Sequence, residues 1–134
     1  MAEYTIRTTV DRPYEETVEA VREQLAAAGF GVLTEIDLKA TLKKKLDVDV
    51  PAQVILGACR PQLAHQALQA DPSIAALLPC NVVVRATGES TTVVEAFDPT
   101  AMTAFAGTGE ALQTVATDAR ERLTSALDAL KENR

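Results

Sequence analysis

The chain contains few of the residues that mark common binding and catalytic proteins. It has no Trp, and aromatic residues make up 4% of its 134 positions, so few rings are present to stack on bases or sugars. Positive charge is scarce as well: 13 Lys and Arg residues stand against 19 Asp and Glu, for a formal net charge of −6. Affinity for a phosphate backbone or an anionic lipid surface depends on Lys and Arg. The composition therefore argues against nucleic-acid and membrane partners.

Long apolar runs are also absent. No segment approaches the roughly 20 apolar residues that cross a bilayer. A signal peptide begins with basic residues followed by an apolar run, and the N-terminus shows no such pattern. We therefore expect a cytoplasmic protein. Its two cysteines, Cys59 and Cys80, are expected as thiols in that compartment rather than as a disulfide.

The length and the apolar content suit one folded domain. A chain of this size buries roughly two-thirds of its extended-chain surface, and the 47% of hydrophobic residues supply a core without a disulfide or a metal. The sequence has no linker, internal repeat or low-complexity segment. Residues 1–134 are therefore expected to form a single domain.

Apolar periodicity, β-branched runs and the positions of Gly and Pro predict the order of the elements. Strands are expected at 4–10, 30–36, 53–59, 80–85 and 91–97. Helices are expected from Pro13 to Gly29, at 38–46, at 61–70, and from a cap at Thr108 to about Lys131. A hairpin turn at 87–90 joins the last two strands. This mixture of crossovers and a hairpin predicts an α+β fold with helices covering one side of the sheet.

The chemically distinctive residues lie in one block of about 22 residues. It holds both cysteines and the only histidine, His65. The cysteine spacing is not Cys-x-x-Cys, which excludes a zinc knuckle and a thioredoxin motif. Three ligands, Cys59, His65 and Cys80, would suffice for a zinc ion with one open position, but no standard motif has this spacing. We therefore expect no metal.

The direction of strand pairing decides whether the two cysteines meet. Cys59 ends one expected strand and Cys80 begins another. Parallel neighbours would place these ends roughly 20 Å apart at opposite edges of the sheet, whereas antiparallel neighbours would bring them together. Each cysteine is otherwise a small buried hydrophobic residue. The sequence leaves these alternatives open.

Three further residues lie beside the cysteines. A helix that begins at Pro61 presents free backbone N–H groups that can bind an anion, and Arg60 would add a positive charge there. His65 lies at the edge of that helix's apolar face, either as a surface residue or as a proton donor or ligand contact. Asn81 begins a strand and either fixes the loop or faces a ligand.

Other familiar sites are absent from the sequence. The lysine run 43–45 is expected at a solvated helix end. No nucleophile elbow, paired-carboxylate motif, phosphate loop or dinucleotide fingerprint is visible. We therefore expect no cofactor, and whether the protein is an enzyme stays open.

Several ordered motifs together resemble the domain-of-unknown-function 302 family over about residues 20–100. The motifs are Thr34–Leu46, Ile55–Cys59, Pro61, Leu63–His65 and Leu77–Val82. The resemblance implies a small α+β domain with a curved, mainly antiparallel sheet packed against a long C-terminal helix, and shorter helices between strands. It also implies a homodimer. The fold is grouped by shape with TATA-binding-protein-like domains, which implies no DNA binding.

The resemblance also marks individual positions. The marked residues are Asp37, Lys39, Gly57, Ala58, Cys59, Pro61, His65, Pro79, Cys80 and Asn81. Arg60 departs from the family pattern, in which Asn is more usual after the cysteine.

From these observations we expect a cytosolic, dimeric domain that binds a small ligand between the sheet and the turn at Cys59. The candidate ligand-binding residues are Lys39, Cys59, Arg60, His65, Cys80 and Asn81. One alternative is a thiol- or metal-dependent enzyme or redox sensor that uses Cys59, Cys80 and His65. Another is a structural module whose function is its homodimeric interface.

Overall fold

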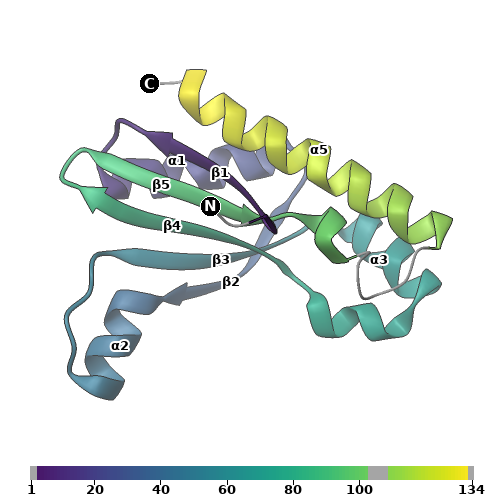
Figure 1. Ribbon diagram of the computed structural model, residues 1–134, viewed down its shortest axis with the longest axis horizontal. Coiled ribbons are helices and arrows are strands. Elements are labelled where there is room, and N and C mark those ends of the chain that lie inside the picture. Colours follow the sequence, from purple (N-terminus) through teal and green to yellow (C-terminus); the bar gives the residue numbers. More distant parts are fainter. Residues whose placement is uncertain (1–2, 103–108, 133–134) are drawn as a thin grey trace.

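The computed structural model describes residues 3–102 and 109–132 of the chain (Figure 1). The elements are, in order, β1 (Thr5–Val10), α1 (Tyr14–Ala27), β2 (Gly31–Asp37), α2 (Leu38–Leu46), β3 (Gln53–Cys59), α3 (Pro61–Ala70), the 3-10 helix η1 (Pro72–Leu77), β4 (Cys80–Gly88), β5 (Thr91–Phe97), the 3-10 helix η2 (Pro99–Met102) and α5 (Glu110–Glu132). The cap expected at Thr108 lies outside the described residues.

The five strands form one sheet in the order β1-β5-β4-β3-β2, and every neighbouring pair is antiparallel. The long α5 and the shorter helices between strands complete an α+β fold, which confirms the expected class. The sequence did not decide between parallel and antiparallel pairing of β3 and β4. The register, with Val54 opposite Val84 and Ala58 opposite Cys80, shows that the pairing is antiparallel.

Local chemistry explains where the shorter helices begin and end. The Asp37 carboxylate accepts a hydrogen bond from the Ala40 N–H at 2.9 Å and so caps α2. Pro61 occupies the first turn of α3, where a missing N–H costs nothing. The Asp71 carboxylate then accepts from the Ser73 N–H at 3.1 Å and starts η1. Gly29, with a φ of +91°, ends α1 in the left-handed region.

One face of the sheet makes the main core. Its members alternate along the strands and pack against α1 and α5, which both cover this face (Figure 1). The fully buried members include Val10, Leu56, Val82, Val84 and Val94 from the strands, Val21 and Leu25 from α1, and Leu123 and Leu130 from α5.

A second apolar cluster lies beyond the sheet, under the first half of α5. Its buried members are Leu63, Ala67, Ile74, Met102, Leu112, Val115 and Ala119. They come from α3, η1, η2 and α5, so these elements form a unit against the end of the sheet where β3 finishes and β4 begins. Among the helices of the described ranges, none combines the length and apolar character needed to cross a membrane.

Candidate ligand-binding cavity

The sheet brings the two cysteines to the same place. Because β3 and β4 are antiparallel neighbours, Ala58 pairs with Cys80, and Cys59 follows Ala58 at the end of β3. Paired Cα atoms lie about 5 Å apart and one step along a strand is about 3.3 Å, so the Cα atoms of Cys59 and Cys80 are about 6 Å apart. Both residues are free thiols and line one cavity.

The cavity has a volume of about 40 Å³ and lies where the two apolar clusters meet. That volume accommodates about three water-sized groups, since one such group needs roughly 10–15 Å³. The lining residues are Phe30, Ala58, Cys59, Arg60, Leu63, Ala64, Ala67, Leu78, Cys80, Pro99, Met102, Val115, Ala116 and Ala119. Apart from Arg60 and the two thiols, all of these side chains are apolar.

The two thiols differ in their environment. Cys80 is 8% exposed, at the inner wall, whereas Cys59 is half-buried. Burial raises the pKa of the Cys80 thiol to about 11, and Cys59 adds a smaller effect in the same direction. Cys80 is therefore a neutral thiol at physiological pH and a poor nucleophile. Cys59 is the more accessible of the two.

Arg60 brings the only charged side chain that lines the cavity among the described residues. Its Nε is buried and has no hydrogen-bond partner within the described ranges. The side chain lies across Gly29, because a Cβ built on Gly29 would be 3.0 Å from that Nε. Gly29 thus allows the guanidinium to approach the α1–β2 turn. A buried donor without an acceptor is costly, and a bound molecule with an oxygen acceptor would satisfy it.

Asp98 holds another wall of the cavity in place. Its carboxylate accepts hydrogen bonds from the Thr100 N–H at 3.0 Å, the Thr100 hydroxyl at 2.7 Å and the Arg120 Nε–H at 3.0 Å. These contacts join η2, which supplies Pro99 and Met102, to α5. Burial alone would raise the pKa of Asp98, but the bonds from Thr100 and Arg120 outweigh it and lower that pKa.

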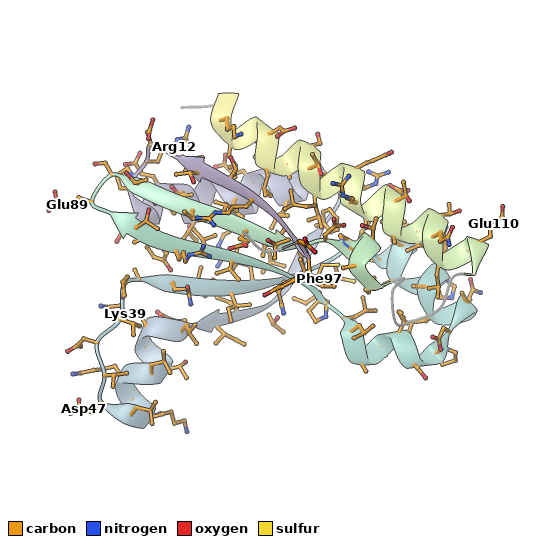
Figure 2. All side chains as sticks on the ribbon, in the orientation of Figure 1. Arg12, Lys39, Asp47, Glu89, Phe97 and Glu110 are labelled. Carbon is orange, nitrogen blue, oxygen red and sulfur yellow. The ribbon has the colours of Figure 1, made fainter. Side chains whose placement is uncertain are left out.

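The other sequence-derived candidates lie away from the cavity. His65 is exposed on α3 and does not line it. Asn81 is exposed, pairs with Gly57, and therefore faces the side of the sheet opposite to Cys80. The Lys39 ammonium donates to the Val50 carbonyl at 3.0 Å, which ties α2 to the segment before β3. Figure 2 shows Lys39 on α2, at the opposite end of the molecule from Glu110, where α5 begins.

The motif glycine at position 57 has a packing role. A Cβ on Gly57 would overlap the Thr34 hydroxyl and come within 2.7 Å of Cγ of Pro79. Gly57 therefore lets side chains from β2 and from the segment before β4 meet across β3. For the zinc alternative, the described part of the chain contains no group of three His, Cys, Asp or Glu side chains that could hold a metal.

Sequence reasoning missed most of the cavity wall. Val115, Ala116 and Ala119 of α5 and Met102 of η2 all line it. Their spacing in the sequence is that of any apolar helix face, because a residue that faces a small cavity has the same pattern as one that faces another side chain. No signal in the sequence distinguishes the two cases.

Comparisons with known proteins identify the family and agree with the overall fold. The family model of the domain of unknown function DUF302 matches residues 6–130. The chain is similar to a solved structure described as an uncharacterized conserved protein DUF302 from Bacillus stearothermophilus, with 30% sequence identity and a TM-score of 0.86. That likeness covers 97% of this chain and 100% of the other. No curated protein matches the chain. The chain therefore belongs to the DUF302 family.

Proposed function

We propose that this protein binds a small amphipathic molecule in the cavity beside Cys59. A short aliphatic carboxylate suits the site best. Its apolar chain would occupy the space between Cys80, Leu63 and Val115, and its carboxylate would accept from the Nε–H of Arg60. The observation that carries the proposal is the pairing of an apolar cavity with a buried, unpartnered cationic donor at its border.

The border of the cavity has the properties of an entrance. Cys59, Arg60, Ala64 and Leu78 are half-buried, whereas the inner lining residues such as Cys80 are buried. A ligand that enters from this side would present its apolar end first. The charged end of the ligand would remain near solvent, where the outer nitrogen atoms of the Arg60 guanidinium keep their hydration.

The cavity size sets an expected affinity. Three buried methylene or methyl groups contribute about 2.4 kcal/mol at about 0.8 kcal/mol each, and a hydrogen bond from a charged donor adds about 2 kcal/mol. The sum of about 4.4 kcal/mol is close to the value for a millimolar Kd. Association also costs translational and rotational freedom, so rigid binding of a four-carbon acid is expected to be millimolar or weaker.

Titration calorimetry with a homologous series of carboxylates tests the proposal. We expect butanoate to bind more tightly than acetate, and propylammonium, which has the same three-carbon apolar chain and the opposite charge, not to bind. Ala116→Leu fills the cavity and should abolish binding, while His65→Ala, on the exposed side of α3, should leave it unchanged. Equal binding of butanoate and propylammonium, or full binding to Ala116→Leu, would contradict the proposal.

The shared cavity of the two thiols favours a second candidate, a redox-active dithiol. The distance of about 6 Å between their Cα atoms lies within the range of 4.4–6.8 Å found in disulfides. Because alternation along the strands starts Cys59 and Cys80 on opposite faces of the sheet, the end of β3 would have to rotate for the two sulfur atoms to meet. A Cys59 thiolate would attack a peroxide, releasing hydroxide and forming a sulfenic acid. The Cys80 thiol would then displace water to give a disulfide. Mass spectrometry of the intact protein after peroxide treatment should show the loss of two hydrogens. Neither Cys59→Ser nor Cys80→Ser should show this loss.

We also propose that the protein is cytoplasmic, a location that fits both candidate functions. Cys59 and Cys80 are free thiols although they line the same cavity, and thiols persist in a reducing compartment. Cell fractionation with an antibody against the native protein tests this point. Recovery in a secreted or periplasmic fraction would contradict it.

A further inference from the structure

A thiol and a cationic donor lie next to each other at the entrance of the cavity. Cys59 is the last residue of β3, and Arg60 directly precedes the first turn of α3. Both residues line the cavity and both are half-buried. The Nε of Arg60 is buried without a hydrogen-bond partner in the described part of the chain. A molecule that carries both a sulfur atom and an oxygen acceptor would contact the two side chains at once.

The start of α3 adds further donors for an anion at this entrance. Arg60 occupies the N-cap position, and its side chain makes no capping hydrogen bond. The N–H groups of Gln62 and Leu63 in the first turn have no partner within the helix, and a helix N-terminus carries partial positive charge. Negative charge is therefore favoured beside Arg60, although the whole chain has a net charge of −6.

The apolar interior limits the size of the group that can lie behind this entrance. Its volume of about 40 Å³ accommodates about three groups at roughly 10–15 Å³ each. The inner wall is buried and apolar, with Leu63 and Ala67 from α3 and Val115 from α5. One sulfur atom and two methylene groups match this space, whereas a peptide-sized thiol such as glutathione exceeds it.

We propose that the cavity takes a short mercaptocarboxylate, such as 3-mercaptopropionate, as a mixed disulfide with Cys59. The inference rests on the proposed function, because the carboxylate would accept from the Nε–H of Arg60 as in the reversible complex. The sulfur atom and the two methylene groups would occupy the apolar space, and the new bond to Cys59 would hold them there.

The reaction that forms this bond is thiol–disulfide exchange. The Cys59 thiol loses its proton to solvent, and its thiolate attacks one sulfur atom of the symmetrical disulfide of the mercaptocarboxylate. A new S–S bond forms on Cys59, the original S–S bond breaks, and the second mercaptocarboxylate leaves as a thiolate. Cys59 is thereby oxidised, and the leaving half of the disulfide is reduced.

Cys80 does not remove the ligand once it is bound. Its side chain starts on the opposite face of the sheet from Cys59, since Cys80 pairs with Ala58. It is 8% exposed, and burial raises the pKa of its thiol to about 11, so the neutral thiol is a poor attacking group. The mixed disulfide therefore persists until an external thiol attacks it. The redox-active dithiol would instead replace it by a disulfide between the two cysteines.

Reaction of the full chain with three small disulfides tests the inference. Bis(2-carboxyethyl), bis(2-hydroxyethyl) and bis(2-aminoethyl) disulfide each deliver one sulfur atom and two methylene groups, and they differ only in the end group. Intact-protein mass spectrometry with proteolytic mapping gives the rate of adduct formation at Cys59. Each rate is divided by the rate for the same chain unfolded in urea, which removes differences in intrinsic reactivity. We expect the carboxylate to be favoured over the ammonium by at least about tenfold.

Variants separate the contact with Arg60 from other effects of charge. Arg60→Met should remove the preference for the carboxylate, while an unchanged rate with the uncharged hydroxyethyl disulfide shows that the site remains folded. Arg22→Met should keep the preference, because Arg22 is also half-buried but pairs with Glu35 and does not line the cavity. Ala116→Leu fills the cavity and should suppress the carboxylate adduct.

Three results would overturn the inference: equal relative rates for the carboxylate and the ammonium, a preference that survives in Arg60→Met, and loss of two hydrogens in place of the adduct. Calorimetry with butanoate separates this failure from failure of the proposed function. If butanoate binds and no preference is seen, reversible carboxylate binding stands and the mixed disulfide is rejected. If butanoate does not bind, a clear preference supports the mixed disulfide alone, and the lack of a preference rejects both.

Discussion

Replacing Arg60 by Met should stabilise the ligand-free protein. The Nε–H of Arg60 is buried without an acceptor in the described structure, and such a group costs about 1–3 kcal/mol. Met keeps most of the apolar stem that lies over Gly29, so packing is largely retained. The outer part of the guanidinium on this half-buried residue stays hydrated, which reduces the expected gain to about 1 kcal/mol.

Urea unfolding followed by circular dichroism measures this change directly. A gain of about 1 kcal/mol raises the urea midpoint at an unchanged slope and raises Tm by about 4 °C for a domain of this size. The same variant should lose butanoate binding, because the acceptor on the ligand no longer has a charged donor. Stability and ligand binding would then move in opposite directions, as expected where a site keeps an unsatisfied group for function.

Arg22→Met provides the matched control. Arg22 is also half-buried, but its guanidinium pairs with Glu35, so its replacement should lower the free energy of unfolding by up to about 1 kcal/mol or leave it unchanged. If Arg60→Met destabilises the protein as much as Arg22→Met, or more, then Arg60 has a partner in solution. The donor would not be available to a ligand.

Three further predictions concern the architecture of the site. Gly57→Ala should lower the free energy of unfolding by about 2 kcal/mol or more in urea titrations, because the added methyl overlaps neighbouring side chains. The pKa of Glu95 is lowered, chiefly by the hydrogen bond from Thr5. The pKa of Asp98 is also lowered, by its bonds from Thr100 and Arg120. Both carboxylates therefore stabilise the fold above about pH 5, and the free energy of unfolding should fall as the pH drops through their lowered pKa values. In thermal melts recorded at several pH values, Asp98→Asn should show a weaker dependence of Tm on pH than the wild type. With a thiol reagent under native conditions, Cys59 should react before Cys80, whose thiol is buried and has a pKa of about 11; equal rates would contradict this order.

Local signals predicted the elements around the site well. The helix at Leu38–Leu46 has the bounds expected from the cap at Asp37, and the helix at Pro61–Ala70 those expected from Pro61 and Asp71-Pro72. Such signals depend on residues close in sequence, whose chemistry directly determines backbone conformation. The α+β class followed from the order of these elements.

Spatial relations between distant segments could not be predicted in the same way. The meeting of Cys59 and Cys80 depends on the antiparallel pairing of β3 with β4, and a connection of about 20 residues permits either direction. The sequence grouped His65 with the cysteines, yet one helical turn places it on the exposed face of α3. The contribution of α5 to the cavity depends on helix packing across more than 50 residues of chain, for which no local pattern exists.

Lys39 and Gly57 illustrate how motif residues acquire structural explanations. Lys39 donates to a backbone carbonyl before β3, and Gly57 makes room for Thr34 and Pro79. Both roles concern the geometry around the sheet and neither residue lines the cavity. The residues that remain for ligand chemistry are Cys59, Arg60 and Cys80.

The most direct test of the proposed ligand site is an isotope-filtered NMR experiment on the wild-type protein with butanoate. We predict intermolecular NOEs from the butanoate methyl group to the methyl groups of Leu63, Val115 and Ala119, together with a shift of the Arg60 Nε–H resonance. Both signals should disappear in Arg60→Met. NOEs confined to residues outside the cavity, or an unchanged Arg60 Nε–H resonance at saturating butanoate, would contradict the proposal.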